Sequence, residues 1–175
     1  VFIQSLESDE DSFWLEPFVE VTTNLEGAEK YLGADEILVK TWSENEPLVK
    51  SFLASKIDRE GWTLHLIGKD KQDDYSQELK NFIHQNNLQE AVFIYGSCND
   101  VKSILGQAKV GILVSSYEGF PVTLLEYGMA GLTVISTDVG YCSMIIQNEV
   151  TGYLIASDNE VQLEEVFIKI VTLTF

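Results

Sequence analysis

From residue 36 onward the chain alternates short apolar runs with amphipathic segments, and this alternation restricts the possible folds most strongly. We expect strands near residues 36–42, 62–67, 91–95, 110–114, 132–136 and 153–155. We expect helices near residues 45–57, 73–86, 99–107, 121–130, 142–148 and 159–171. Strands separated by helices in this way favour an α/β fold, a doubly wound, mostly parallel Rossmann-like sheet with helices on both faces. In such open sheets, ligands bind at the carboxyl ends of the strands.

The first 35 residues differ from the rest of the chain in composition. Residues 1–36 hold ten acidic residues and one lysine, a net charge of −9 that leaves −8 for the other 139 residues. An acidic stretch of this kind is usually solvated or acts as a linker. We therefore predict an acidic N-terminal segment over residues 1–35, an inter-domain linker or an edge element. A Rossmann-like domain is then expected over residues 36–175.

Charge and cysteine content argue against several classes of partner. The net charge of −17 disfavours nucleic acid, whose phosphates would be repelled. No apolar run approaches the roughly 20 residues that a membrane-spanning helix needs. Cys98 and Cys142 have no partners at metal-ligand spacing, so we expect two free thiols in a reducing cytoplasm and no metal. The chain starts without methionine or a basic region, so we expect a fragment or trimmed chain without a signal peptide.

Residues 115–128 contain the strongest candidate for a binding site. They follow the apolar run 110–114, and Pro121 opens an apolar-periodic segment, so a strand, a turn and a helix are expected in that order. Amides at the start of a helix can hold an anion. Glu118 in the turn and Glu126 in the helix could accept hydrogen bonds from hydroxyls beside that anion. This combination suits a nucleotide sugar. The alternative stays open that Glu118 only caps the helix and that Glu126 is solvated.

The same stretch resembles the signature of retaining glycosyltransferases of family 4, glycosyltransferase group 1. In that signature two glutamates are separated by seven residues, which is the spacing of Glu118 and Glu126. The resemblance runs from roughly residue 36 to residue 171. Four further segments carry it, at residues 62–68, 91–96, 129–140 and 148–154.

The resemblance implies one half of a two-domain GT-B architecture, the half that binds the donor. The expected function is hexosyl transfer, with retention, from a UDP-, GDP- or ADP-sugar to a glycan, a lipid or a small acceptor, as in polysaccharide biosynthesis. No metal or other cofactor is expected. The acceptor would bind a missing N-terminal Rossmann-like domain, so this chain alone should bind weakly and turn over little. The expected location is the cytoplasm, including the inner membrane face if the missing domain attaches there.

The resemblance also assigns roles to individual residues. Glu118 would be catalytic, contacting the donor sugar and stabilising the transition state, and Glu126 would bind the ribose hydroxyls. Pro121 would fix the start of the helix. The remaining donor-binding residues would line the diphosphate and nucleotide pocket: Gly119, Phe120, Val122, Thr123, Gly68, Lys69, Tyr95 and Gly96. Other side chains are better explained by packing, namely His65, Tyr75, Tyr117 and Tyr127.

Two departures from the family pattern bear on catalysis. The family usually carries an arginine just after the first strand and a lysine about five residues later, and these cations neutralise the diphosphate. Here the corresponding residues are Thr41 and Glu46. In the loop after residue 136, Gly140 is followed by Tyr141 where the family tends to have a second glycine. The alternatives are therefore a degenerate, non-catalytic GT-B-like domain used for binding or assembly, or another GT-B enzyme such as a nucleotide-sugar epimerase.

Overall fold

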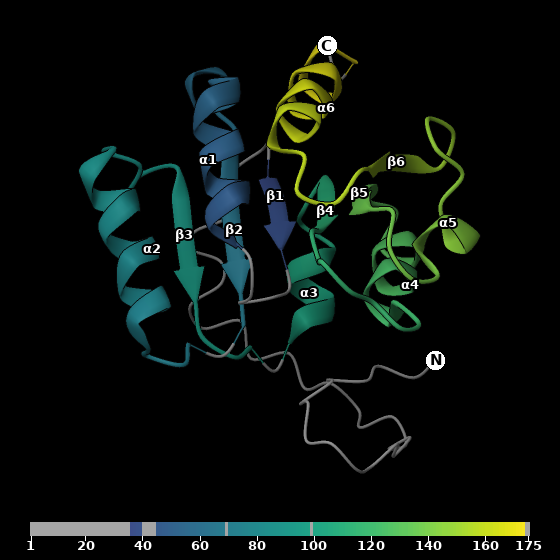
Figure 1. Cartoon of the computed structure of the whole chain (residues 1–175), viewed down its shortest axis with the longest axis horizontal. Coiled ribbons are helices and arrows are strands. Elements are labelled where there is room, and N and C mark those ends of the chain that lie inside the picture. The colour runs from purple at the N-terminus through teal and green to yellow at the C-terminus, as the bar shows by residue number, and fades with distance from the viewer. Residues whose placement is uncertain (1–35, 40–44, 69, 99, 174–175) are drawn as a thin grey trace.

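One six-stranded parallel sheet organises the chain, with strand order β3-β2-β1-β4-β5-β6. The computed structural model describes residues 36–39, 45–68, 70–98 and 100–173 (Figure 1). The predicted segment over residues 1–35 lies outside the described residues. The strands are β1 (Glu36–Val39), β2 (Thr63–Ile67), β3 (Val92–Tyr95), β4 (Val110–Leu113), β5 (Thr133–Thr137) and β6 (Gly152–Ile155). The strand order reverses between β1 and β4, which is where such sheets bind their ligands.

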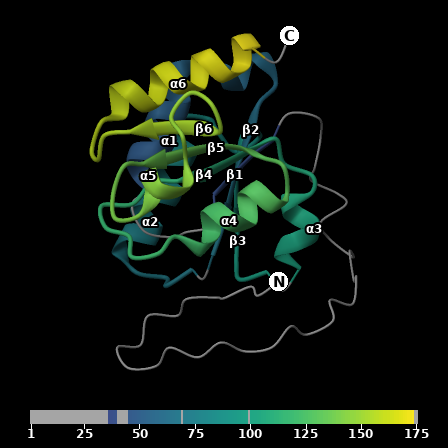
Figure 2. The same cartoon turned by 90° about the vertical axis from the view of Figure 1, so that its right-hand side faces the viewer.

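Helices connect the strands and cover both faces of the sheet (Figures 1 and 2). They are α1 (Asn45–Ser55), η1 (Ile57–Glu60), α2 (Asp74–Gln85), α3 (Val101–Leu105), α4 (Val122–Met129), α5 (Cys142–Ile145) and α6 (Glu160–Leu173). The doubly wound α/β prediction is thus confirmed, and every predicted strand and helix is present with slightly different ends. Residues 40–42 of the first predicted strand lie outside the described residues.

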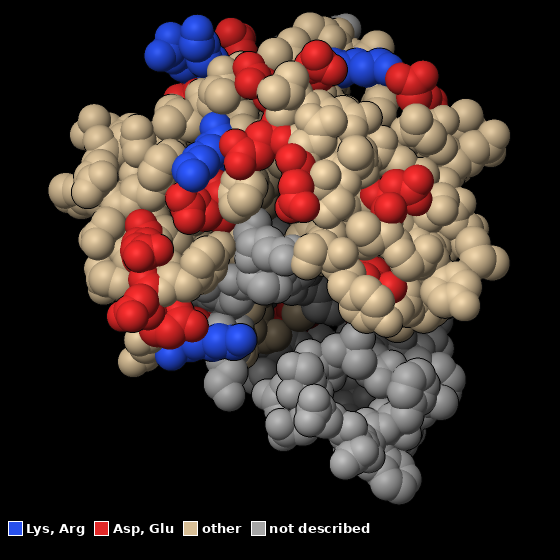
Figure 3. Space-filling model, in the orientation of Figure 1, with Lys and Arg blue, Asp and Glu red and all other residues tan. Residues whose placement is uncertain are grey.

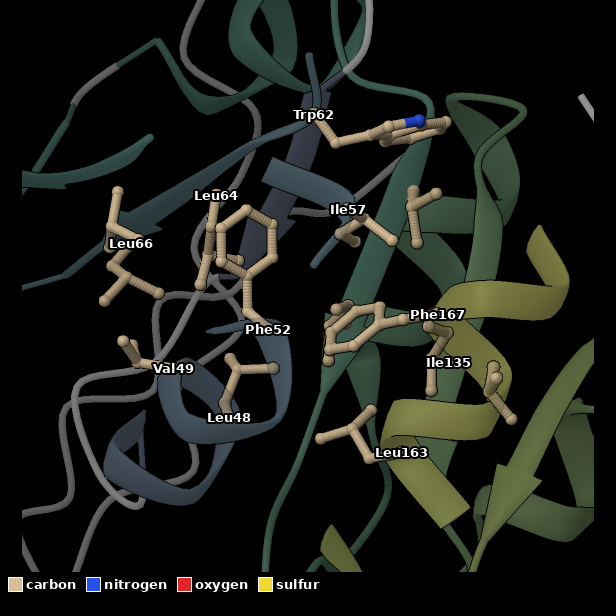
Figure 4. Packing of buried hydrophobic residues seen from close by; sticks show 14 of the residues in the cluster. Leu48, Val49, Phe52, Ile57, Trp62, Leu64, Leu66, Ile135, Leu163 and Phe167 are labelled. Atoms are coloured by element: carbon tan, nitrogen blue, oxygen red, sulfur yellow. The ribbon is translucent and has the colours of Figure 1, made fainter. Parts of the chain in front are cut away.

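Two apolar cores lie on opposite faces of the sheet. Residues of α1, α2 and α6 build the larger core, and residues of α3, α4 and α5 build the smaller one. Alternate side chains of one strand enter different cores, as Ile135 and Val134 of β5 do. Phe52 of α1 meets Phe167 of α6 edge-on, with ring centroids 6.3 Å apart (Figure 4). Burial of such a ring contributes about 1.5–3 kcal/mol, so this pair holds α1 and α6 on one face.

The expected helix over 45–57 ends earlier than predicted. Lys56 takes a left-handed conformation with φ 59°, which stops α1 at Ser55, and the separate 3-10 turn η1 follows. Gly61 closes η1 with φ 86°. The helix expected over 142–148 likewise ends at Ile145, because Ile146 is extended.

Helix α4 is held against β4 by one close contact. A Cβ atom at Gly111 of β4 would lie 2.5 Å from Cγ of Tyr127, so only glycine leaves room for that ring. The hydroxyl of Tyr127 donates a hydrogen bond of 3.1 Å to the carbonyl of Ile112. Tyr127 is fully buried, which confirms its predicted packing role. This contact sets where α4 begins at the carboxyl end of β4.

None of the described helices has the length and apolar character that crossing a bilayer requires.

Candidate functional site

The turn between β4 and α4 has the predicted strand, turn and helix order. Pro121 is the N-cap residue of α4, with φ −80° and ψ 83°, and the helix itself starts at Val122. The helix therefore begins one residue later than expected, with Pro121 as its N-cap instead of its first residue. Pro121 itself makes no side-chain hydrogen bond to the helix. The hydrogen bond that the structure gives for the Glu118 carboxylate is accepted from Ser115, so it does not support the alternative role of Glu118 as a helix cap.

Several backbone amides at this helix start remain open to a ligand. The amide of Val122 donates to the carbonyl of Phe120 at 3.0 Å, and the amide of Leu124 donates to Pro121 at 3.1 Å. Among the described residues, the amides of Gly119, Phe120 and Thr123 have no acceptor. A Cβ atom at Gly119 would meet no described atom within 4 Å. An anion could therefore approach this turn, where the helix dipole favours negative charge.

Glu118 lies partly buried in the turn and is held by a neighbour. Its Oε1 accepts a hydrogen bond of 2.8 Å from the hydroxyl of Ser115. Ser115 is itself joined to Thr137, the last residue of β5, by two hydrogen bonds through its backbone. Sequence reasoning missed this contact, because Ser115 and Thr137 meet only through the pairing of β4 with β5.

Glu126 is 7 % exposed in the second turn of α4. The alternative that it is a solvated helical residue is therefore wrong. Glutamate is rarely buried to this degree, because removing a carboxylate from water is costly. Its burial on the helix that follows the open amides makes it a candidate for binding rather than for surface charge.

The other predicted site residues lie at the ends of β2 and β3. Gly68 follows β2, Tyr95 ends β3 and Gly96 follows it, whereas Lys69 lies outside the described residues. Parallel strands share one carboxyl edge, so these residues lie on the same edge as the β4–α4 turn. Three strand spacings separate β3 from β4, roughly 14 Å. The structure thus divides the predicted residues into two groups on one edge.

His65 of β2 is a sheet residue, as predicted. Its Nδ1 lies 3.0 Å from the hydroxyl of Tyr95, and its Nε2 lies 2.9 Å from the hydroxyl of Thr63. Its ring stacks on Phe93 with centroids 5.1 Å apart. Burial lowers the pKa of His65 to about 4, so the imidazole is neutral at pH 7. By contrast Tyr117, predicted to pack, is 84 % exposed, so that prediction is wrong.

A cavity of about 250 Å³ lies at the same edge, toward α1 and α6. Ser115, Ser116 and Thr137 form one wall, and the starts of α1 and α6 form others. Of the predicted site residues that the structure describes, none lines this cavity. Ser115, which donates to the Glu118 carboxylate, and Thr137, which binds Ser115, both line this cavity.

Glu46, at the expected lysine position, lies in the first turn of α1. Its carboxylate pairs with Lys50 at 2.8 Å, and its amide donates to the hydroxyl of Tyr75 at 3.0 Å. The hydrogen bond to Glu46 raises the pKa of Lys50. Thr41 lies outside the described residues. Acidic side chains also outnumber basic ones on the visible face (Figure 3). The described part of the chain thus has a Glu46–Lys50 ion pair where the family pattern has a lysine.

Comparisons with known proteins give a consistent picture. The family described as glycosyl transferases group 1 matches residues 42–174. The UDP-Gal:alpha-D-GlcNAc-diphosphoundecaprenol alpha-1,3-galactosyltransferase of Escherichia coli is 32 % identical over 83 residues, 45 % of this chain and 21 % of that protein. The lipopolysaccharide 1,6-galactosyltransferase of E. coli K12 is 32 % identical over 121 residues, 63 % of this chain and 32 % of that protein. The chain thus spans about a fifth to a third of these relatives.

Solved structures share the fold. The C-terminal domain of a glycosyl transferase group 1 protein (LpcC) from Francisella tularensis has a TM-score of 0.75 at 21 % identity, covering 83 % of this chain and 79 % of that one. The Anabaena protein HepE, solved in complex with UDP, has a TM-score of 0.73 at 17 % identity, covering 81 % of this chain and 40 % of that one.

Proposed function

This chain belongs to the glycosyl transferases group 1 family, and we propose that it is the donor-binding part of a retaining GT-B glycosyltransferase. The donor would be a nucleotide diphosphate sugar bound at the carboxyl edge of the sheet. The remainder of the protein would bind the acceptor, a glycan, a lipid or a small molecule. Because this chain spans a fifth to a third of its curated relatives, the complete transfer reaction is a property proposed for the whole protein.

One observation carries the proposal, namely that the β4–α4 turn and helix α4 together hold open amides and two carboxylates. The amides of Gly119, Phe120 and Thr123 suit the diphosphate. Glu126 suits the two ribose hydroxyls, since a carboxylate can accept two hydrogen bonds. Glu118 would lie beside the donor sugar and stabilise the positive charge that develops there. The diphosphate would be held by amides without a metal or other cofactor.

Among nucleotides we favour UDP. One relative is named for UDP-Gal, and the Anabaena protein was solved with UDP and with UDP-glucose. The relatives' names concern lipopolysaccharide, polysaccharide and a lipid-linked acceptor, so we propose a role in polysaccharide biosynthesis. Cys98 and Cys142 are free thiols among the described residues, in line with the cytoplasm as location.

A second candidate is a binding domain that no longer supports catalysis. The Glu46–Lys50 ion pair favours it, because Glu46 stands where a cation would help the diphosphate to leave. Both candidates require the chain to bind a nucleotide, and they differ only in whether the full protein transfers the sugar. Calorimetry with this chain therefore tests nucleotide binding first.

The test is titration of the chain with UDP, GDP and ADP. We expect UDP to bind most tightly and Glu126→Gln to weaken it by at least about tenfold, the effect of losing hydrogen bonds to a charged group. Glu165→Gln, on the exposed face of α6, is the matched control and should leave affinity unchanged. If none of the three nucleotides binds the unmodified chain, the proposed function is wrong.

A further inference from the structure

The turn that carries Glu118 is fixed by contacts from the end of β5. The backbone ladder between β4 and β5 pairs Leu113 with Ser136 as its last register position. Beyond that point the turn leaves the sheet. Side-chain contacts from β5 take over where the backbone pairing ends.

Thr137 makes the first of these contacts. Its hydroxyl accepts a hydrogen bond from the amide of Ser115 at 3.0 Å and donates one to the carbonyl of Ser115 at 2.7 Å. Thr137 is 1 % exposed. One buried hydroxyl therefore satisfies both backbone groups of Ser115, and it fixes that residue next to β5.

Ser115 makes the second contact, with the carboxylate itself. Its hydroxyl donates to Oε1 of Glu118 at 2.8 Å. A hydrogen bond to a charged oxygen is stronger than one between neutral groups. Held by one oxygen, Glu118 can turn its other oxygen toward a ligand.

Gly140 makes a third contact from the loop after β5. It has φ 54°, and a Cβ atom there would overlap the carbonyl oxygen of Glu118. The backbone of Glu118 therefore rests directly on the backbone of Gly140. The Glu118 carboxylate, the Glu118 backbone and the backbone of Ser115 are thus each fixed by a contact.

We propose that Ser115 and Thr137 are positioning residues that orient the Glu118 carboxylate. The inference rests on the proposed function only for its effect on the donor sugar. Thr137 fixes the backbone of Ser115, and Ser115 fixes the Glu118 side chain. The two steps are separable, since Ser115→Ala removes the bond to Glu118 and keeps both backbone bonds to Thr137.

Two measurements on the full chain test the proposal. NMR three-bond couplings report whether the Glu118 side chain has one rotamer in the ligand-free protein. Calorimetry with UDP and with UDP-galactose gives the ratio of the two dissociation constants, which is the contribution of the sugar.

We expect one Glu118 rotamer in the unmodified chain and averaging in Ser115→Ala and Thr137→Val. The contribution of the sugar should fall about tenfold in both, while UDP affinity stays within about twofold. Ser115→Thr and Thr137→Ser keep the hydroxyls and should restore both readouts. Thr133→Val, at the exposed opposite end of β5, is the matched control.

A double variant separates positioning from general stability. Adding Ser115→Ala to Glu118→Ala should cause no further loss in the contribution of the sugar if Ser115 acts through Glu118. Failure of the unmodified chain to bind any nucleotide overturns the proposed function, and the rotamer measurement then decides the positioning role alone. A Glu118 rotamer that is averaged in the unmodified chain, or unchanged in Ser115→Ala, overturns the positioning role.

Discussion

His65 is the residue that most directly links acidity to stability. Its pKa is lowered to about 4 by burial, below the 6.5 of an exposed histidine. Between these two values the unfolded chain binds the proton and the folded chain does not, so stability falls as pH falls from 7 toward 4. We predict that His65 alone accounts for a loss of about 2 kcal/mol in the free energy of unfolding between pH 7 and pH 5.

Urea denaturation at pH 7 and pH 5 measures this loss. His65→Gln removes the titrating group and should abolish about 2 kcal/mol of the pH dependence. The chain has one other histidine, His84, which is exposed on α2. The His84→Gln variant should keep the full pH dependence of stability. Asp70 has a pKa of about 2 and does not interfere in this range. Equal pH dependence in both variants would contradict the prediction.

At the residue scale, sequence patterns predicted buried residues within strands and helices better than those in turns. His65 and Tyr127 continue the apolar pattern of a regular element, and both are buried. Tyr117 lies in the β4–α4 turn, where no periodicity indicates a direction, and it is exposed. The link from Ser115 to Thr137 joins residues 22 positions apart, which no local pattern predicts.

At the scale of elements, Gly111 allows α4 to pack closely against β4. A methyl group there would collide with the ring of Tyr127, so Gly111→Ala forces α4 to shift. We predict a loss of about 1–3 kcal/mol in the free energy of unfolding, typical of overpacking. UDP affinity should fall as well, because α4 carries Glu126 and the amide of Thr123 and begins at the turn that holds the other open amides.

Gly128→Ala is the matched control for Gly111→Ala. Gly128 lies within α4, and a Cβ atom there would meet no described atom within 4 Å. Alanine should stabilise this helix by about 0.5–1 kcal/mol and leave UDP affinity unchanged. Urea denaturation and calorimetry measure both effects. Destabilisation of equal size in the two variants would show that the Tyr127 contact is not the cause.

The contact of α6 with α1 gives a second prediction at this scale. Phe167 is 1 % exposed and meets Phe52 edge-on. Phe167→Ala should lower the free energy of unfolding by about 3–5 kcal/mol, because it leaves a cavity between the two helices. Ile168, its neighbour on α6, is 43 % exposed, and Ile168→Ala should cost far less. If thermal or urea denaturation showed similar losses of stability in Phe167→Ala and Ile168→Ala, this account of the core would be contradicted.

Element order was predictable because each strand is a short apolar run and each helix has an amphipathic period. Helix ends were less predictable. The stop of α1 at Ser55 depends on a left-handed Lys56, a residue with no special preference for that conformation. The extended Ile146 that ends α5 has no clear sequence signal either.

At the scale of the whole molecule, charge opposes the proposed ligand. The chain has 28 acidic and 11 basic side chains, for a net charge of −17. A nucleoside diphosphate is also an anion, so its approach is opposed by long-range repulsion. At the site itself, amides and a helix dipole attract it over a short range. The two effects differ in range, and salt separates them.

We predict that UDP binds more tightly as ionic strength rises from about 0.01 M to 0.1 M. The Debye length falls from about 30 Å to about 10 Å over this range, which screens repulsion from the distant carboxylates and leaves the contacts at the turn largely intact. A gain of about threefold in UDP affinity is expected by calorimetry, and uridine, which has no phosphate, should show no change.

If UDP instead binds more weakly in salt, attraction by a cation near the diphosphate dominates. Lys50, which pairs with Glu46 at 2.8 Å, is then the first candidate. Lys50→Gln should in that case remove the salt dependence, whereas under our prediction it leaves the sign of the effect unchanged.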